Sequence, residues 1–309
     1  MKSSKWYSTS ITLTIISSMP HEGLIVAAYG KRYNVELPDG RILSCVTRGK
    51  KVDNAAGDHV TVTLTANNQG VIEKTAKRQT LLYRSNAYKS KILAANVTQI
   101  LIVLATQPSF YEDLLNRCLI AAEAAGIRAV IILNKCDLPN PQAMQKLQQY
   151  AALGYLTLQL NATESVDCLR PLLEGHTSVL VGQSGMGKST IINSLLPEAR
   201  SKTQEISATL DSGKHTTTAT HLYHLDSDSA IIDSPGLQEF GLYHIEEAEL
   251  EYAFVEFRPF IGHCKFNNCT HTHEPGCVIL QALADGQIAP ERHQIFLQIR
   301  AENSVQLYG

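Results

Sequence analysis

The chain has 309 residues, which is enough for two or three domains, and no stretch approaches the ~20 consecutive apolar residues that cross a bilayer. Apolar residues make up 44% and charged residues 18%, a globular composition that excludes a disordered or collagen-like polymer. The net charge of -2 argues against a uniformly basic nucleic-acid binder. Residues 1–93, however, contain 14 Lys and Arg but only 6 Asp and Glu. This local excess of positive charge indicates either a solvated basic face or a polyanionic partner at that end of the chain.

The first 19 residues are expected to be a tail. Lys2 and Lys5 precede a short apolar run at 11–16, which threonines interrupt and which lacks the continuous apolar core of a secretory signal. Met19 stands just before the first well-patterned strand. We expect either that residues 1–18 form a disordered tail or that Met19 is the true start.

Residues 20–82 are expected to form a small β-barrel. Short strands are predicted at 23–29, 32–37, 41–46, 59–64 and 71–72, and Pro38-Asp39-Gly40 predicts a hairpin turn between the second and third. Five short strands in roughly fifty residues indicate an OB-fold. An SH3-like barrel is the alternative, since the pattern alone does not distinguish them.

From residue 97 onward the pattern predicts a parallel α/β sheet covered on both faces. Helices then follow from residue 241. The expected strands are 97–105, 129–133, 155–160, 177–181 and 230–232, and the expected helices are 114–125, 141–152 and 188–196.

A phosphate-binding loop lies between a predicted strand and a predicted helix, and it matches G-x-x-x-x-G-K-[ST] in full. Backbone N–H groups of such a loop surround phosphates, and the helix N-terminus adds a favourable dipole. Lys188 is expected to reach the β- and γ-phosphates, and Ser189 to bind Mg²⁺. The predicted nucleotide-binding residues here are Gly182, Gln183, Ser184, Gly185, Met186, Gly187, Lys188, Ser189 and Thr190.

A base-reading loop, Asn134-Lys135-Cys136-Asp137, follows the predicted strand 129–133. Asp137 can accept hydrogen bonds from the N1–H and 2-amino groups of guanine, and adenine offers neither. Each bond to a charged acceptor is worth roughly 1.5–3 kcal/mol, so the loop predicts GTP rather than ATP. This loop precedes the phosphate loop in the chain, which is the reverse of the usual order and indicates a circular permutation. Such a permutation preserves the nucleotide site, because ligands bind at the carboxyl ends of the strands whatever order the chain follows.

Two switch segments are predicted between residues 213 and 236. Asp233-Ser234-Pro235-Gly236 matches D-x-x-G, so Asp233 is expected to hold Mg²⁺ and Gly236 to sense the γ-phosphate. Upstream, Thr217 is the favoured Mg²⁺-binding threonine, with Thr216 and Thr218 as alternatives. Leu237 stands where many GTPases carry a water-orienting Gln, and His215 is the nearest candidate for that catalytic role.

A Cys/His cluster near the C-terminus predicts one structural zinc site. Cys264, Cys269, His271 and Cys277 read C-x4-C-x-H-x5-C, and three thiolates with one imidazole make a closed tetrahedral set. His263 and His273 are rival imidazoles at this stage.

The motifs and their order resemble one family, the ribosome small subunit-dependent GTPase A family (RsgA, also called YjeQ), over about residues 22–300. The resemblance implies an OB-fold that binds RNA (20–82), a circularly permuted P-loop GTPase domain (83–243) and a C-terminal α-helical zinc-binding domain (244–309). It implies Mg²⁺ with GTP, and it assigns the zinc to the four cluster residues and the switch histidine to His215. Where the family carries Ser-Ala near guanine O6, this chain has Asn161-Ala162, also expected to bind GTP.

The resemblance further implies a cytoplasmic monomer, without a membrane partner, that binds the 30S subunit and 16S rRNA. It would assist late 30S maturation and hydrolyse GTP to GDP and phosphate when the subunit stimulates it. A nucleotide-gated rRNA-binding scaffold with incidental hydrolysis is the first alternative, and a P-loop ATPase, against which Asp137 argues, is the second. Because the second switch runs almost directly into the zinc domain, a nucleotide-dependent shift of that domain is also expected.

Overall fold

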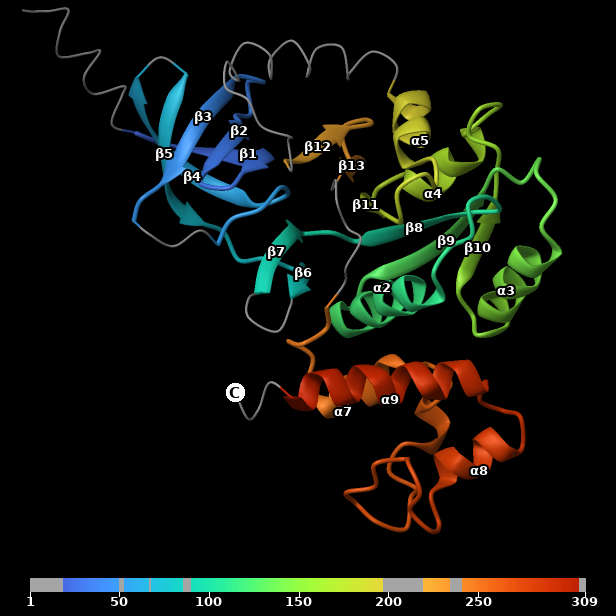
Figure 1. Ribbon diagram of the computed structural model, residues 1–309. Coiled ribbons are helices and arrows are strands. Elements are labelled where there is room, and N and C mark those ends of the chain that lie inside the picture. The colour runs from blue at the N-terminus through green and yellow to red at the C-terminus, as the bar shows by residue number, and fades with distance from the viewer. Residues whose placement is uncertain are drawn as a thin grey trace, which may run out of the picture.

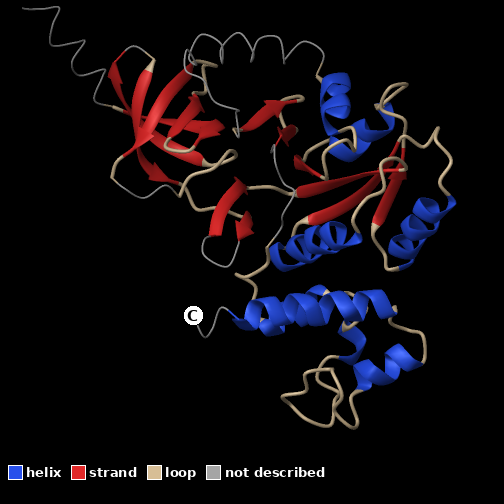
Figure 2. Ribbon diagram, viewed as in Figure 1, coloured by secondary structure: helices blue, strands red, loops and turns tan. Residues whose placement is uncertain are grey.

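A computed structural model describes residues 19–49, 53–66, 68–85, 90–196, 219–233 and 241–305 of the chain. A β-barrel lies at one end, an α/β domain in the middle and a helical domain beneath it (Figures 1 and 2). Within these ranges no helix combines the length and apolar character needed to span a membrane.

The barrel is a closed five-stranded OB-fold, which confirms the expected class. Strand β1 pairs with both β2 and β4, and β3 pairs in parallel with β5, so the strand order around the barrel is β1-β2-β3-β5-β4. Alternate residues fill its interior, among them Ile25, Tyr33 and Val62, all fully buried. The strands are β1 (Pro20–Tyr29), β2 (Arg32–Glu36), β3 (Ile42–Thr47), β4 (His59–Ala66) and β5 (Gln69–Thr75).

A hairpin that the sequence pattern did not predict follows the barrel. Its strands, β6 (Leu81–Ser85) and β7 (Ser90–Ala95), form a separate two-stranded sheet. Leu82 and Leu93 join the same hydrophobic core as the central domain. The expected boundary after residue 82 therefore falls inside β6, and the hairpin packs with the central domain.

The central domain is a doubly wound sheet in the order β10-β9-β8-β11-β13-β12, parallel except for β12. From β8 the chain moves outward to β10, returns to β11 beside β8, and builds the other half, so the strand order reverses between β8 and β11. Ligands bind at such a switch point, beyond the carboxyl ends of the strands. The strands are β8 (Gln99–Ala105), β9 (Arg128–Asn134), β10 (Leu156–Gln159), β11 (Thr177–Val181), β12 (Thr220–His224) and β13 (Ala230–Asp233).

Helices cover both faces of this sheet (Figure 2). Along β8, Ile100 and Ile102 point into one core with α2 and α3, whereas Leu101 and Val103 point into the other with α4 and α5. The helices are α2 (Glu112–Ala125), α3 (Pro141–Ala152), α4 (Arg170–Leu173, after a 3-10 turn at Asp167–Leu169) and α5 (Lys188–Leu195).

The C-terminal domain packs against α2 of the central domain (Figure 1). Two buried arginines hold it there: Arg117 of α2 pairs with Glu302 at 2.7 Å, and Arg292 pairs with Glu256 at 2.5 Å and contacts Asn116 of α2. Its helices are α7 (Glu247–Ala253), α8 (Val278–Ala284) and α9 (Pro290–Val305), with a 3-10 turn at Arg258–Phe260.

Candidate functional site

The phosphate loop leaves the end of β11 and enters α5, at the strand-order reversal of the sheet. Two of its glycines are required by close approach as well as by backbone conformation. A Cβ on Gly182 (φ +147°) would lie 2.3 Å from the Val103 carbonyl oxygen. A Cβ on Gly187 (φ +93°) would lie 2.1 Å from Asn134 Nδ2. The loop therefore lies directly against β8 and against the base-reading loop.

Lys188 lies at the start of α5, with its side chain folded back over the loop. Its Nζ donates to the carbonyl oxygens of Gly182 and Gln183, at 2.6 and 2.7 Å. Burial lowers the pKa of Lys188, and Asp233 opposes that shift. The ammonium group is thus held over the loop within electrostatic range of the predicted Mg²⁺ ligand.

Asn134 joins the base-reading loop to two other loops. This buried side chain at the end of β9 donates from Nδ2 to the Met186 carbonyl oxygen at 2.9 Å. Its Oδ1 accepts from the Ala162 N–H at 3.0 Å. One amide therefore fixes the phosphate loop, the base-reading loop and the Asn161-Ala162 loop relative to one another.

The rest of the base-reading loop is supported from the segment that follows β8. Lys135 has a left-handed backbone (φ +59°), its carbonyl oxygen accepts from Thr106 Oγ1 at 2.7 Å, and its Nζ donates to the Gln107 carbonyl oxygen at 2.8 Å. Cys136 and Asp137 are exposed at the tip. The Asp137 carboxylate therefore lies at the surface of the site, where a base could reach it.

The Asn161 side chain is engaged within its own loop. Its Oδ1 accepts from the N–H and the Oγ1 of Thr163, at 3.2 and 2.7 Å. The Ala162 N–H already donates to Asn134. A guanine contact from Asn161 and Ala162 remains a prediction. Their hydrogen bonds to Thr163 and Asn134 fix the conformation of the loop.

Asp233 ends β13 beside the phosphate-loop strand. It is paired in register with Leu180 of β11 on one side and with His221 of β12 on the other. Burial lowers the pKa of His221, and Asp233 opposes this shift, so the two lie close. The predicted residues His215, Thr217 and Gly236 lie outside the described residues.

The predicted metal ligands converge at one point. The donor atoms of Cys264, Cys269, His271 and Cys277 all lie within 4.8 Å of one another. The sulfur atoms of Cys264 and Cys277 are 3.8 Å apart, and His271 Nδ1 is 3.7 and 3.3 Å from them. Thiolates bound to a tetrahedral Zn²⁺ at about 2.3 Å would lie about 3.8 Å apart, so the donor set fits such an ion. The rival imidazoles, His263 and His273, are exposed and outside the cluster.

Glu251 is a member of this site that the sequence pattern did not reveal. It lies on α7, 20 residues before His271, and its Oε1 is 2.9 Å from His271 Nε2. A second contact comes from α9, where His293 Nε2 bonds to the His271 carbonyl oxygen at 2.8 Å. Carboxylates in this position fix the tautomer and orientation of a metal-binding imidazole.

Replacing Glu251 with Gln should weaken zinc binding by about 10-fold, because the imidazole loses its charged acceptor while the four donor atoms remain. Competition with a chromogenic chelator measures this affinity. Glu247→Gln, an exposed position on the same helix, serves as the control. Equal zinc affinity in Glu251→Gln and the control would show that the contact does not support the metal.

The phosphate loop follows a central strand of the sheet, and the base-reading loop lies against it although it comes earlier in the chain. This arrangement defines a circularly permuted GTPase. The RsgA GTPase family model matches residues 75–243 of the chain. The chain therefore belongs to the RsgA GTPase family and is a GTP hydrolase.

Similar proteins extend this match to nearly the whole chain. "Small ribosomal subunit biogenesis GTPase RsgA" from Burkholderia pseudomallei (strain K96243) is 53% identical over 290 residues, which cover 92% of each chain. The protein of the same name from Paraburkholderia xenovorans (strain LB400) is 49% identical over 300 residues, 93% of this chain and 95% of the relative.

Two solved structures share the fold. YjeQ from Thermotoga maritima has a TM-score of 0.70 at 26% identity and matches 92% of this chain and 99% of its own. YloQ, described as a circularly permuted GTPase, has a TM-score of 0.66 at 28% identity and matches 94% of this chain and 97% of its own.

Proposed function

We propose that this GTPase binds the 30S ribosomal subunit in the cytoplasm, assists its late maturation, and hydrolyses GTP when the subunit stimulates it. The observation that carries the proposal is the 53% identity, over 92% of each chain, to a relative named for small-subunit biogenesis. The contacts of Asn134, which join the phosphate and base-reading loops, support retention of nucleotide binding in this chain.

In the proposed mechanism Asp137 selects guanine, and the phosphate loop holds the phosphates with Lys188. Ser189, Thr217 and Asp233 would hold the Mg²⁺, which supplies positive charge to the β- and γ-phosphates. A water attacks the γ-phosphorus, the bond to the β-phosphate oxygen breaks, and GDP and phosphate leave. His215 is proposed to orient that water.

We propose that residues 20–82 bind RNA, that residues 83–243 bind and hydrolyse GTP, and that residues 244–309 form a scaffold stabilised by zinc. The zinc, held by the Cys₃His cluster, would stabilise the last domain and leave no open position for substrate. We propose a monomer.

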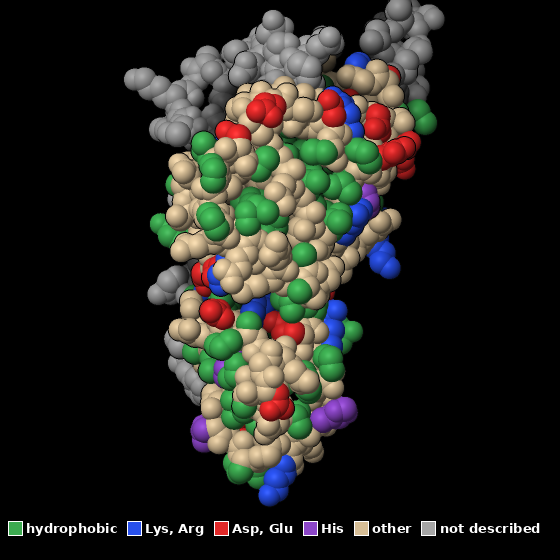
Figure 3. Space-filling view, turned by 90° about the vertical axis from the view of Figure 1, so that its right-hand side faces the viewer, with side chains coloured by type: hydrophobic (Ala, Val, Ile, Leu, Met, Phe, Trp, Pro, Cys, Tyr) green, Lys and Arg blue, Asp and Glu red, His purple; other side chains and the backbone are tan. Residues whose placement is uncertain are grey.

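The 16S rRNA contact is proposed to lie on the barrel and to be electrostatic. Arg48 remains 78% exposed although its Nη1 lies 2.7 Å from Glu73, so its guanidinium can still reach phosphate. On the face seen in Figure 3, which lies away from the barrel, acidic and basic side chains are interspersed. Interspersed charge gives that face no uniform attraction for RNA.

Co-sedimentation with purified 30S subunits tests the partner. Binding is expected with a non-hydrolysable GTP analogue and is expected to weaken with GDP and with rising salt. Absence of co-sedimentation with either nucleotide, at low salt, would contradict the proposed partner.

A further inference from the structure

Strand β12 belongs to both the nucleotide domain and the barrel. On one side it pairs antiparallel with β13, placing His221 opposite Asp233. On the other it pairs antiparallel with β1, placing His221 opposite Ala27 and Thr220 opposite Ala28. The barrel and the central sheet are therefore one continuous sheet of 11 strands, and β12 is the strand at which they join.

The position of β12 in the chain ties this joint to the switches. The strand begins two residues after Thr218, the end of the predicted first switch, and its partner β13 ends at Asp233, the start of the second. A displacement of β12 along its pairing with β13 would therefore move the end of the first switch relative to the start of the second.

Side chains on the two sides of the joint are in contact at His221. Its ring meets the ring of Tyr29, the last residue of β1, edge-to-face at 5.5 Å between centroids. It also stacks at 6.1 Å on Tyr223 of its own strand. His221 thus contacts a barrel aromatic ring and is also the β12 residue paired in register with Asp233.

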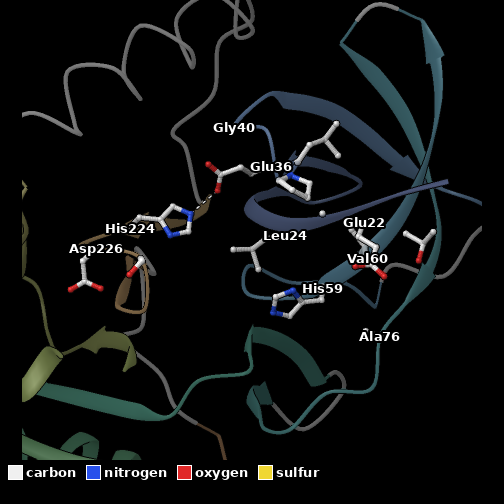
Figure 4. A pocket seen from close by; sticks show the side chains of 14 residues that line it. Glu22, Leu24, Glu36, Gly40, His59, Val60, Ala76, His224 and Asp226 are labelled. Atoms are coloured by element: carbon white, nitrogen blue, oxygen red, sulfur yellow. Dashed lines mark hydrogen bonds and ion pairs between the residues drawn. The ribbon is translucent and has the colours of Figure 1, made fainter. Parts of the chain in front are cut away.

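A second tie lies at the other end of β12. His224 Nε2 is 2.6 Å from Glu36 Oε2 on barrel strand β2 (Figure 4). Both residues line a cavity of about 650 Å³ between the barrel and the β12–β13 turn. The cavity leaves open volume beside the joint, where Leu24 and Val26 of β1 also pack against the core of the central domain.

The C-terminal domain is attached through α2 of the central domain. It shares a hydrophobic core with α2 and is held by arginines that are nearly fully buried, Arg117 and Arg292. Arg117 pairs with Glu302 across the boundary and Arg292 bonds across it to Asn116, so this domain is expected to move with the central domain as one body. The sequence favoured this domain as the one that responds to nucleotide, whereas the geometry favours the barrel.

We propose that β12 is the strand through which a 30S subunit bound at the barrel accelerates hydrolysis, with the Tyr29–His221 ring contact as the link between the barrel and β12. This proposal rests on the proposed function. Contact of the subunit with the barrel shifts β1, the strand pairing and the ring contact carry that shift to β12, and the pairing of β12 with β13 carries it to Asp233.

The test compares Tyr29→Ala with Tyr29→Phe in the full chain. For each we measure the Kd for GTP, the Kd for 30S, basal kcat, and kcat and KM with saturating subunits. Tyr29→Ala is expected to lower the stimulated kcat by about 10-fold, the size of a typical coupling between sites, with basal kcat and both Kd values unchanged. Tyr29→Phe, which keeps the ring, should be stimulated like the wild type.

Glu36→Gln gives an independent second variant, which removes the negative charge from the contact with His224. Since that pair is partly exposed, a loss of about threefold in the stimulated kcat is expected. Full stimulation of both Tyr29→Ala and Glu36→Gln would overturn the inference. A parallel loss of 30S affinity in Tyr29→Ala would also overturn it, because the ring would then be a direct subunit contact. A wild-type chain that no 30S preparation stimulates would refute the proposed function itself, and this inference with it.

Discussion

Replacing His215 with Ala should lower the subunit-stimulated kcat by about 10²-fold, while GTP binding and 30S binding stay at wild-type levels. Leu237 follows the D-x-x-G segment and cannot orient a water, so another polar group must do so. In the sequence, His215 immediately precedes the threonines from which the Mg²⁺-binding residue of the first switch is predicted. Single-turnover hydrolysis with saturating 30S measures the chemical step directly.

His215→Gln offers a matched comparison, since an amide can orient water without exchanging a proton. It should retain more stimulated turnover than His215→Ala. His273→Ala, which removes an exposed imidazole of the C-terminal domain, is the control for a general effect. A stimulated rate in His215→Ala equal to that of the wild type would mean that the catalytic group comes from elsewhere in the protein or from the ribosome.

Replacing Asp137 with Asn should weaken GTP binding by about 10²-fold or more and should favour XTP. The carboxylate would accept two hydrogen bonds from guanine, each worth roughly 1.5–3 kcal/mol, and the amide would present N–H to the 2-amino group. Xanthine carries an oxygen at that position and can accept from the amide. Asp137 is exposed at the tip of its loop, so the substitution should leave the fold intact.

Titration of labelled GTP and XTP against wild type, Asp137→Asn and Asp167→Asn measures this preference. Asp167 is another exposed aspartate, in the 3-10 turn before α4, and it pairs with Arg170 at 3.1 Å, so its replacement should change neither affinity. Unchanged preference of Asp137→Asn for GTP would remove Asp137 from the base-reading role.

Local signals made several elements predictable from the sequence. Helix α3 has the predicted bounds, because Asn140 caps it by accepting from the Ala143 N–H at 3.0 Å and Pro141 occupies its first turn. The phosphate loop was equally predictable, because its motif specifies glycine at positions 182 and 187. In the structure both positions approach neighbouring atoms too closely for a side chain.

Elements that depend on distant partners were not predictable in the same way. The hairpin of β6 and β7 buries Leu82 and Leu93 against residues of α2, which the chain reaches only later. Strand β12 is five residues long and is defined by its pairing with β1 and β13. Glu251 lies on a helix outside the metal motif, and no ligand spacing points to it. The choice of an OB-fold over an SH3-like barrel likewise depends on the parallel pairing of β3 with β5.

The most direct measurement of the central claim is steady-state GTP hydrolysis by the full chain with and without purified 30S subunits, with 50S subunits as the control. We expect slow turnover alone, a large increase in kcat with 30S, and no increase with 50S. Turnover that is the same with and without 30S, at concentrations where the two co-sediment, would contradict a subunit-stimulated GTPase and would favour a nucleotide-gated scaffold instead.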